Sequence, residues 1–251
     1  MPYLNSHISF VNHLLDLNLD KKYLQSGAIF PDIGMHVKLS NIKDFTDFFH
    51  DKEPEAKKGF IFSKELIKNA KNKKELSFAI GFYSHFYLDK KVHTLFHKLK
   101  LNDDEHLMLE FYRSYKDKDF KINKIYFPKK FFIETFKKTF KKEKDLKKYI
   151  KQIESINELK LFKYKTFINL NIKFLVKNNY GNKQKNNFLI KSVFSFHRKN
   201  YLKRYKLDIF KYLNPNKELK KKYFKMLNDV ISESQKNFKD KIKNNRILYK
   251  W

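Results

Sequence analysis

The chain has no cysteine and little glycine or proline. Among its 251 residues there are no cysteines, five glycines and five prolines. Without cysteine there can be no disulfide and no thiolate ligand, so any metal site must use nitrogen and oxygen donors. Because glycine and proline interrupt helices, their scarcity favours a mostly helical protein, as do periodic stretches of Lys, Leu, Ile, Phe and Glu.

Long apolar runs and a leader-like N-terminus are also missing. No run of apolar residues approaches the length needed to cross a bilayer, so we expect no transmembrane segment. The first residues do not show the basic, then apolar, then small pattern of a signal peptide. We therefore expect a cytoplasmic protein whose contact with a membrane is at most peripheral.

Helical periodicity predicts an all-α fold of many helices. In the first half we expect one helix from about Ser6 to Leu24, a turn at Gly27–Asp32 and a loop through His50. Further helices are expected at about 54–71, 74–99, 103–116, 129–142, 144–156 and 160–178, with others after a break at 178–182.

Eight of the nine histidines lie before residue 107, and they form two patterned runs. The first run reads His85-x3-Asp89-x3-His93, and the second reads His106-x3-Glu110. Each step of four residues overshoots a helical turn by about 40°, so the first three side chains stay within about 80° of one another. His97 drifts to about 120° from the first histidine and is expected at the rim or surface.

These runs predict a metal site made of imidazoles and carboxylates. A single histidine on an apolar helix face is usually a hydrogen-bonded core residue, and one His/Asp pair four residues apart is often a surface contact. Two such arrays within thirty residues favour metal instead. Nitrogen and carboxylate donors converging on a face of Phe, Leu and Tyr are typical of zinc.

The order of the motifs resembles that of a known family. A histidine near the N-terminus (His7), then Gly27-Ala-Ile-Phe-Pro-Asp32, then the two histidine runs, follow one another as in zinc-dependent phospholipases C and the related single-strand-specific zinc nucleases. The resemblance covers roughly residues 1–112. It implies the all-α fold of that family, with a metal cluster in the N-terminal half.

The resemblance also implies a ligand set for two or three zinc ions. Asp89 and His85 would bind one ion together with Asp32, and Asp89 would bridge to another ion held by His7. The remaining site would be made by His93, His106 and Glu110. The family's secreted members also use the N-terminal amine, which processing of Met1 would leave on Pro2.

One family ligand has no clear counterpart. The family pattern places a histidine roughly fifteen residues after the Pro-Asp element, where this chain has Thr46-Asp47-Phe48. Asp47 would replace nitrogen by oxygen, which zinc accepts. His50 would need a shift of one helical turn, and His36 precedes the segment. We expect His50 to be the ligand, with Asp47 and His36 as alternatives.

The ligand set predicts hydrolytic chemistry on a phosphodiester. A zinc ion with three or four such ligands can keep a position for water, whose pKa falls toward neutrality. We expect Asp32 to orient or deprotonate that water. Gly27 looks like a helix C-cap, and Pro31 stiffens the turn that would direct the Asp32 carboxylate.

Charge is divided unevenly along the chain, whose net charge is +29. Residues 1–110 hold 16 Lys and Arg against 15 Asp and Glu, whereas the remaining 141 residues hold 40 against 12. We therefore distinguish a metal-binding catalytic core at 1–116 from a basic helical half at 117–251, packed as part of the same domain. Such a basic half would attract an anionic membrane or nucleic acid.

Lysines alternate with aromatic residues in the segment from Phe131 to Lys142, as in a helix that lies on a membrane surface. Two other interpretations of this segment remain. The aromatic stripe could pack into the core while the lysines are solvated, or the many lysines could reflect the composition of an A/T-rich genome.

Three functions fit this sequence. The first is a zinc-dependent phosphodiesterase that resembles phospholipase C and acts on phospholipid head groups. The second is a zinc nuclease that cleaves single-stranded nucleic acid. The third is a member that binds metal without catalysis.

Overall fold

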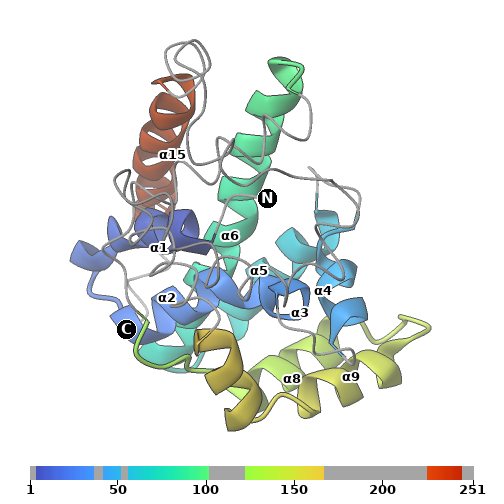
Figure 1. Cartoon of the computed structure of the whole chain (residues 1–251). Coiled ribbons are helices and arrows are strands. Elements are labelled where there is room, and N and C mark those ends of the chain that lie inside the picture. Colours follow the sequence, from blue (N-terminus) through green and yellow to red (C-terminus); the bar gives the residue numbers. More distant parts are fainter. Residues whose placement is uncertain (1–3, 37–41, 52–55, 102–121, 167–224, 245–251) are drawn as a thin grey trace, which may run out of the picture.

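The computed structural model describes residues 4–36, 42–51, 56–101, 122–166 and 225–244 (Figure 1). Within these ranges the chain forms helices and no strand, which confirms the predicted all-α fold. None of the described helices combines the length and apolar character that a membrane span requires. In chain order they are α1 (Leu4–Asn12), η1 (Leu15–Leu17), α2 (Lys21–Ile29), η2 (Phe30–Asp32), α3 (Ile33–His36), α4 (Lys43–Phe49), α5 (Lys57–Asn69), α6 (Lys73–Lys98), α8 (Lys129–Thr139), α9 (Leu146–Glu154) and α15 (Lys225–Asn244); residues 158–166 are also helical.

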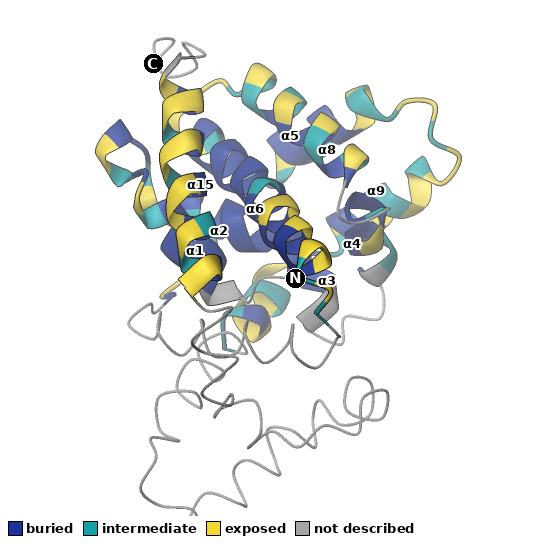
Figure 2. Cartoon of the chain, turned by 90° about the horizontal axis from the view of Figure 1, so that it is seen from above, coloured by how far each residue is buried: buried dark blue, intermediate teal, exposed yellow. Residues whose placement is uncertain are grey.

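The long helix α6 is the centre of the molecule, and the other helices gather around it (Figures 1 and 2). It begins at Asn72, whose side chain accepts a hydrogen bond from the Glu75 backbone N–H at 3.0 Å. Glu75 in turn accepts one from the Lys71 backbone N–H at 2.8 Å, so the first turn is capped from both directions. Helices α2 and α5 make its most extensive contacts, and α1 and α15 also pack against it.

The predicted single helix from Ser6 to Leu24 is wrong, because the chain breaks between α1 and α2. After the short turn η1, Asn18 adopts a left-handed backbone conformation with φ of 55°. Asp20 then caps α2 by accepting hydrogen bonds from the backbone N–H groups of Lys22 at 2.9 Å and Tyr23 at 3.2 Å. An Asn that tolerates this conformation and an Asp that caps a helix explain the break.

Phenylalanine rings fill the core on the side of α6 that faces α4, α5 and α8. The fully buried rings are those of Phe30, Phe45, Phe49, Phe62, Phe78, Phe82, Phe86, Phe132 and Phe136. Many of them meet edge to face, as Phe49 and Phe82 do at 5.4 Å between ring centroids.

The segment 131–142 belongs to this core rather than to a membrane surface. Phe131, Phe132 and Phe136 of α8 are buried, while Lys137 and Lys138 are exposed. The aromatic stripe therefore packs inward and the lysines are solvated, as expected for a helix that packs its aromatic side into the core.

Helices of the basic half pack directly on the N-terminal helices. In α15, Leu227, Ile231 and Phe238 are buried in the cluster formed with α1 and α6. Lys239 of α15 pairs with Asp16, and Lys241 donates a hydrogen bond to the Tyr83 hydroxyl at 2.8 Å. On the other side, α8 packs on α5 and α9 packs on α4.

Candidate metal centre

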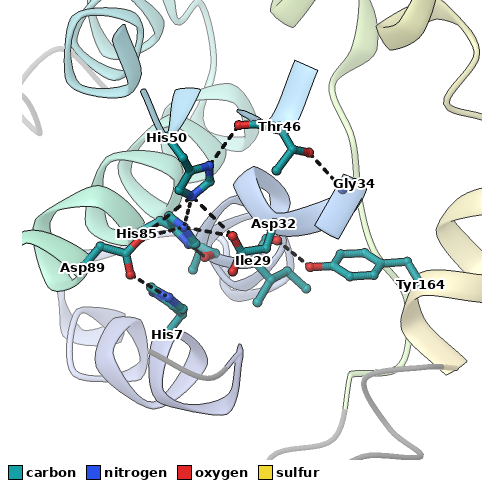
Figure 3. Close-up of polar contacts among 10 residues, drawn as sticks. His7, Ile29, Asp32, Gly34, Thr46, His50, His85, Asp89 and Tyr164 are labelled. Carbon is teal, nitrogen blue, oxygen red and sulfur yellow. Dashed lines mark hydrogen bonds and ion pairs between the residues drawn. The ribbon is translucent and has the colours of Figure 1, made fainter. Parts of the chain in front are cut away.

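Five titratable side chains from four parts of the chain converge in the interior (Figure 3). His7 comes from α1, Asp32 from the end of η2, His50 from the residue after α4, and His85 and Asp89 from successive turns of α6. All five are buried, and even the most accessible of them, His50, is only 8% exposed. Such a concentration of ionisable groups in a phenylalanine core needs a physical reason.

The distances place these groups around common points. His85 Nε2 lies 3.1 Å from Asp89 Oδ2, 3.5 Å from Asp32 Oδ1 and 3.2 Å from His50 Nε2. His50 Nε2 lies 3.3 Å from Asp32 Oδ1, and His7 Nε2 lies 3.3 Å from Asp89 Oδ1. Two sets of three ligand atoms lie within 4.8 Å of one another, one from His7, Asp32 and His85 and one from His50, His85 and Asp89.

Backbone carbonyls determine how two of the imidazoles are presented. The Nδ1 atom of His85 lies 2.8 Å from the Ala28 carbonyl oxygen, and that of His50 lies 2.9 Å from the Thr46 carbonyl oxygen. Because a carbonyl can only accept, each Nδ1 carries the proton, and in a neutral ring Nε2 then offers a lone pair. Two such lone pairs 3.2 Å apart repel unless a proton or a metal cation lies between them.

Other buried donor atoms also fit a metal. Both ring nitrogens of His7 and both carboxylate oxygens of Asp89 are buried, and apart from the contacts within the cluster no described group hydrogen-bonds to them. Leaving such groups unsatisfied costs about 1–3 kcal/mol each, and more when they are charged. Metal coordination would satisfy them, and a set of imidazoles and carboxylates suits zinc. The residues present therefore fit a zinc site.

The pKa values of the cluster show that it stabilises positive charge. Burial lowers the pKa of His7, and the neighbouring His85 lowers it further. Burial opposes protonation of His50, but its hydrogen bond to Asp32 and the charges of Asp32 and Asp89 outweigh burial and raise its pKa to about 9. Burial also opposes protonation of His85, but Asp89 and Asp32 outweigh it and raise the pKa. At Asp89 burial favours the neutral acid, but His85 and His7 outweigh it and hold the pKa well below its usual range. The carboxylates thus create the field that a cation needs.

Comparison with known proteins agrees with this chemistry. The family model described as zinc dependent phospholipase C matches residues 6–206, which is most of the chain. The chain belongs to this family. No curated protein and no solved structure shows a significant match to the chain.

Gly27, in the segment that resembles the zinc-dependent phospholipases C, has a different role from the predicted helix C-cap. Gly27 does not cap a helix, because it lies inside α2, and no described glycine has a positive φ. Instead, a Cβ atom on Gly27 would lie 2.1 Å from the Phe78 carbonyl oxygen of α6. The missing side chain lets α2 approach α6 closely enough for Ala28 to accept the hydrogen bond from His85.

The segment that carries Asp32 is also more regular than the predicted loop. Asp32 ends the 3-10 helix η2, in which Pro31 occupies the first turn, and α3 follows directly. Its carboxylate is completely buried and faces the imidazoles of His50 and His85. Gly34, two residues later, donates a backbone hydrogen bond to the Thr46 hydroxyl at 3.0 Å, which ties this segment to α4.

Of the three alternatives for the doubtful ligand, the structure brings His50 to the cluster. His50 follows α4 directly, and its Nε2 atom lies among the donors described above. Asp47, within α4, is exposed to solvent. The side chain of His36, at the end of α3, lies outside the described residues.

The second predicted group of ligands is described only in part. His93 is buried on α6, two turns beyond His85, and His97 is exposed, in line with the arc expected on a helix. His106, Glu110 and the amine of Pro2 lie outside the described residues, so the group they would form with His93 stays a prediction.

One residue beside the cluster could not be inferred from the sequence. Tyr164 is completely buried and donates a hydrogen bond from its hydroxyl to the Ile29 carbonyl oxygen at 2.7 Å (Figure 3). It therefore holds the junction between α2 and η2, three residues before Asp32. Tyr164 is one of fifteen tyrosines in the chain, and no motif distinguishes it.

Proposed function

We propose that this protein is a zinc-dependent phosphodiesterase that hydrolyses the head-group phosphodiester of a phospholipid. The proposal is carried by one observation, the buried convergence of nitrogen and carboxylate donors in a chain of the zinc-dependent phospholipase C family. The donors are His7, Asp32, His50, His85 and Asp89. Packing alone gives no reason to bury five ionisable groups around shared points, since burying a charge is costly unless it is paired or coordinates a metal.

The geometry supports an assignment of ligands to two ions. Asp89 directs Oδ2 toward His85 and Oδ1 toward His7, which supports it as a ligand that would bridge two ions. His50, His85 and Asp32 would complete the first ion's ligands on one side of that bridge. His7 would hold the second ion on the other side. A third ion would need His93, His106 and Glu110.

The protein's own residues would prepare the reaction in three ways. The Ala28 and Thr46 carbonyls keep His85 and His50 in the tautomer that presents Nε2. The 3-10 helix η2 positions the Asp32 carboxylate, which we assign to accept a proton from the attacking water. Zinc bound there would supply a Lewis acid and lower the pKa of a bound water toward neutrality.

The reaction adds water across a phosphorus–oxygen bond. The water oxygen bonds to phosphorus, the bond to the glycerol oxygen breaks, and that oxygen takes up a proton. The products are a diacylglycerol and a phosphorylated head group. Burial of Asp32 strengthens its attraction for the proton of the attacking water, because a site that excludes bulk water screens less.

Metal analysis followed by parallel hydrolysis assays tests this function. We expect the purified protein to hold at least two zinc ions and to release diacylglycerol from phosphatidylcholine micelles. His85→Ala should lose zinc and activity, whereas His97→Ala, a change on the same helix but at the surface, should retain both. Less than one zinc per chain in the parent protein, unchanged in His85→Ala, would overturn the metal assignment.

The nuclease is the second candidate, and the charge of the chain favours testing it. Residues 111–251 carry 40 Lys and Arg against 12 Asp and Glu, which suits a polyanionic substrate. Both substrates present a phosphodiester to the same ions, so only the assay separates them. Cleavage of single-stranded DNA without cleavage of phosphatidylcholine would identify the nuclease, and bound zinc without either activity would identify a non-catalytic member.

A further inference from the structure

Residues 158–166 form a short helix (Figure 1, dark gold). Its two sides differ in burial. Tyr164 faces inward, where its hydroxyl binds the Ile29 carbonyl beside the metal centre. Leu159 and Phe162 lie three residues apart on the opposite side and are 59% and 57% exposed. They are the most exposed of the large apolar side chains in the described part of the chain. The helix is therefore anchored by one side and presents an apolar pair on the other.

A groove of about 620 Å³ opens beside Phe162 of this pair. Phe162 lines it together with Tyr23 and Tyr126, whose rings lie 5.2 Å apart. Lys124 and Lys165 also line it. The groove thus combines aromatic walls with positive charge.

Positive charge dominates around the groove. Lys165 Nζ lies 4.4 Å from the centre of the Phe162 ring, and Lys124 Nζ lies 5.6 Å from that of Tyr126. Lys163, on the exposed side of the helix, adds a further ammonium group. Glu158 is the one acidic residue that lines the groove. An anionic partner is therefore favoured over a cationic or neutral one.

We propose that this surface, made by Leu159, Phe162, Lys163, Lys124 and Lys165, docks onto the anionic surface of a phospholipid bilayer. Apolar side chains that enter the acyl region, surrounded by lysines that meet acidic head groups, are the features of an interfacial helix. The choice of a lipid rests on the proposed function, because nucleic acid would also attract the lysines. Leu159 favours the lipid, since an aliphatic side chain gains from acyl contact but offers no ring on which a base can stack.

Binding to vesicles in the presence of a chelator tests the proposal without hydrolysis. The parent protein should co-sediment with phosphatidylcholine vesicles that contain phosphatidylserine, and added salt should weaken that binding. The double variant Leu159→Ser/Phe162→Ser should bind at least about tenfold more weakly, because two apolar side chains no longer enter the bilayer. Lys124→Glu/Lys163→Glu should also weaken binding and should remove most of its salt dependence.

Ile61→Ser is the matched control, since Ile61 is a comparably exposed apolar residue, at 52%, that does not line the groove. It should bind vesicles as the parent does. All variants should keep the parent's melting temperature and its turnover of a short-chain, water-soluble phosphodiester. Unchanged vesicle binding in both double variants would overturn the proposal. So would a lowered melting temperature in Leu159→Ser/Phe162→Ser, which would show that the pair packs within the protein.

Two further results separate this proposal from others. Loss of single-stranded DNA binding in the double variants, with vesicle binding retained, would assign the surface to nucleic acid and overturn the lipid. Vesicle binding that depends on Leu159 and Phe162, in a protein that hydrolyses no phosphodiester, would support the docking surface and overturn the proposed function alone.

Discussion

The close crossing of α2 over α6 yields a quantitative prediction, because two glycines face each other's helix there. A Cβ atom on Gly27 would lie 2.1 Å from the Phe78 carbonyl oxygen and 2.9 Å from the Phe82 nitrogen. A Cβ atom on Gly81 would lie 2.1 Å from the Leu24 carbonyl oxygen. These atoms belong to helix backbone and cannot swing away. Either Gly27→Ala or Gly81→Ala must therefore push the helices apart by roughly 1 Å or more to restore an ordinary contact.

The expected cost follows from two opposing effects. Replacing a helical glycine by alanine normally stabilises a helix by about 0.5–1 kcal/mol. Overpacking a buried site costs about 1–3 kcal/mol, and contact with rigid backbone places these variants at the upper end of that range. The net loss is about 2 kcal/mol for each variant, which corresponds to a fall of about 4–8 °C in melting temperature for a protein of this size.

The same displacement would disturb the metal centre. The hydrogen bond from His85 Nδ1 to the Ala28 carbonyl spans this crossing at 2.8 Å, and a shift of roughly 1 Å would break it. We therefore expect Gly27→Ala to bind zinc more weakly as well as to melt earlier. Thermal unfolding followed by circular dichroism, at a fixed free-zinc concentration, and zinc titration would measure both effects.

Gly59→Ala on α5 is the matched control. The three atoms nearest to its Cβ atom would be ring atoms of the Phe86 side chain, the closest at 2.6 Å. A side chain can move where backbone cannot, so its melting temperature should fall less than that of Gly27→Ala or Gly81→Ala. A melting temperature equal to or above that of the parent in both crossing variants would refute the close approach of α2 and α6.

Three further predictions concern the metal centre. His85→Ala and Asp89→Ala should each lose both zinc and thermal stability, because bound metal contributes to the free energy of folding. Elemental analysis and thermal melts would measure the two losses. A variant that keeps as much zinc as the parent would contradict the ligand assignment. His93→Ala should cut zinc content and abolish hydrolysis, while His97→Ala should leave both nearly unchanged. The opposite ranking would contradict the assignment of His93 to the third ion. In chelator-treated protein, the pKa of His50 is raised to about 9, above its unfolded value of about 6.5, so protonated His50 stabilises the fold fully below about pH 6.5 and this stabilisation is lost as pH rises through about 9. The melting temperatures of the parent and of His50→Gln should therefore differ more at pH 6 than at pH 10. A difference that does not change with pH would contradict the raised pKa.

The parts of the centre that sequence could predict are those that depend on local spacing. His85, Asp89 and His93 share one face of α6 because a step of four residues nearly completes a helical turn. The start of that helix was also predictable to within a residue, since Asn72 and Glu75 form a local capping pair. Such features depend only on residues within a few positions of one another.

The parts that failed depend on packing between distant segments. Gly27 looks like a helix end in the sequence, because a glycine after an amphipathic stretch is typical of a C-cap. Its role in the close approach to Phe78 becomes visible only when α6 is in place. The choice between Asp47 and His50 has the same origin, since it depends on how α4 and the residue after it pack against the rest of the chain. Spacing along α4 alone does not contain that information.

The basic half of the chain holds the two short segments that bring Asp32 and His50 to the centre. Tyr164 binds the Ile29 carbonyl at the start of η2, across 135 residues of sequence. Gln152 of α9 accepts a hydrogen bond from the Phe45 backbone N–H at 2.9 Å, in the first turn of the helix that precedes His50. Neither η2 nor α4 is long enough to be stable alone, because helices shorter than about 12–15 residues are marginal in water. The ligands on α6 lie on a long helix capped by its own residues, whereas Asp32 and His50 depend on contacts from the basic half of the chain. A metal centre whose motifs all lie in the first half of the sequence is thus assembled by both halves.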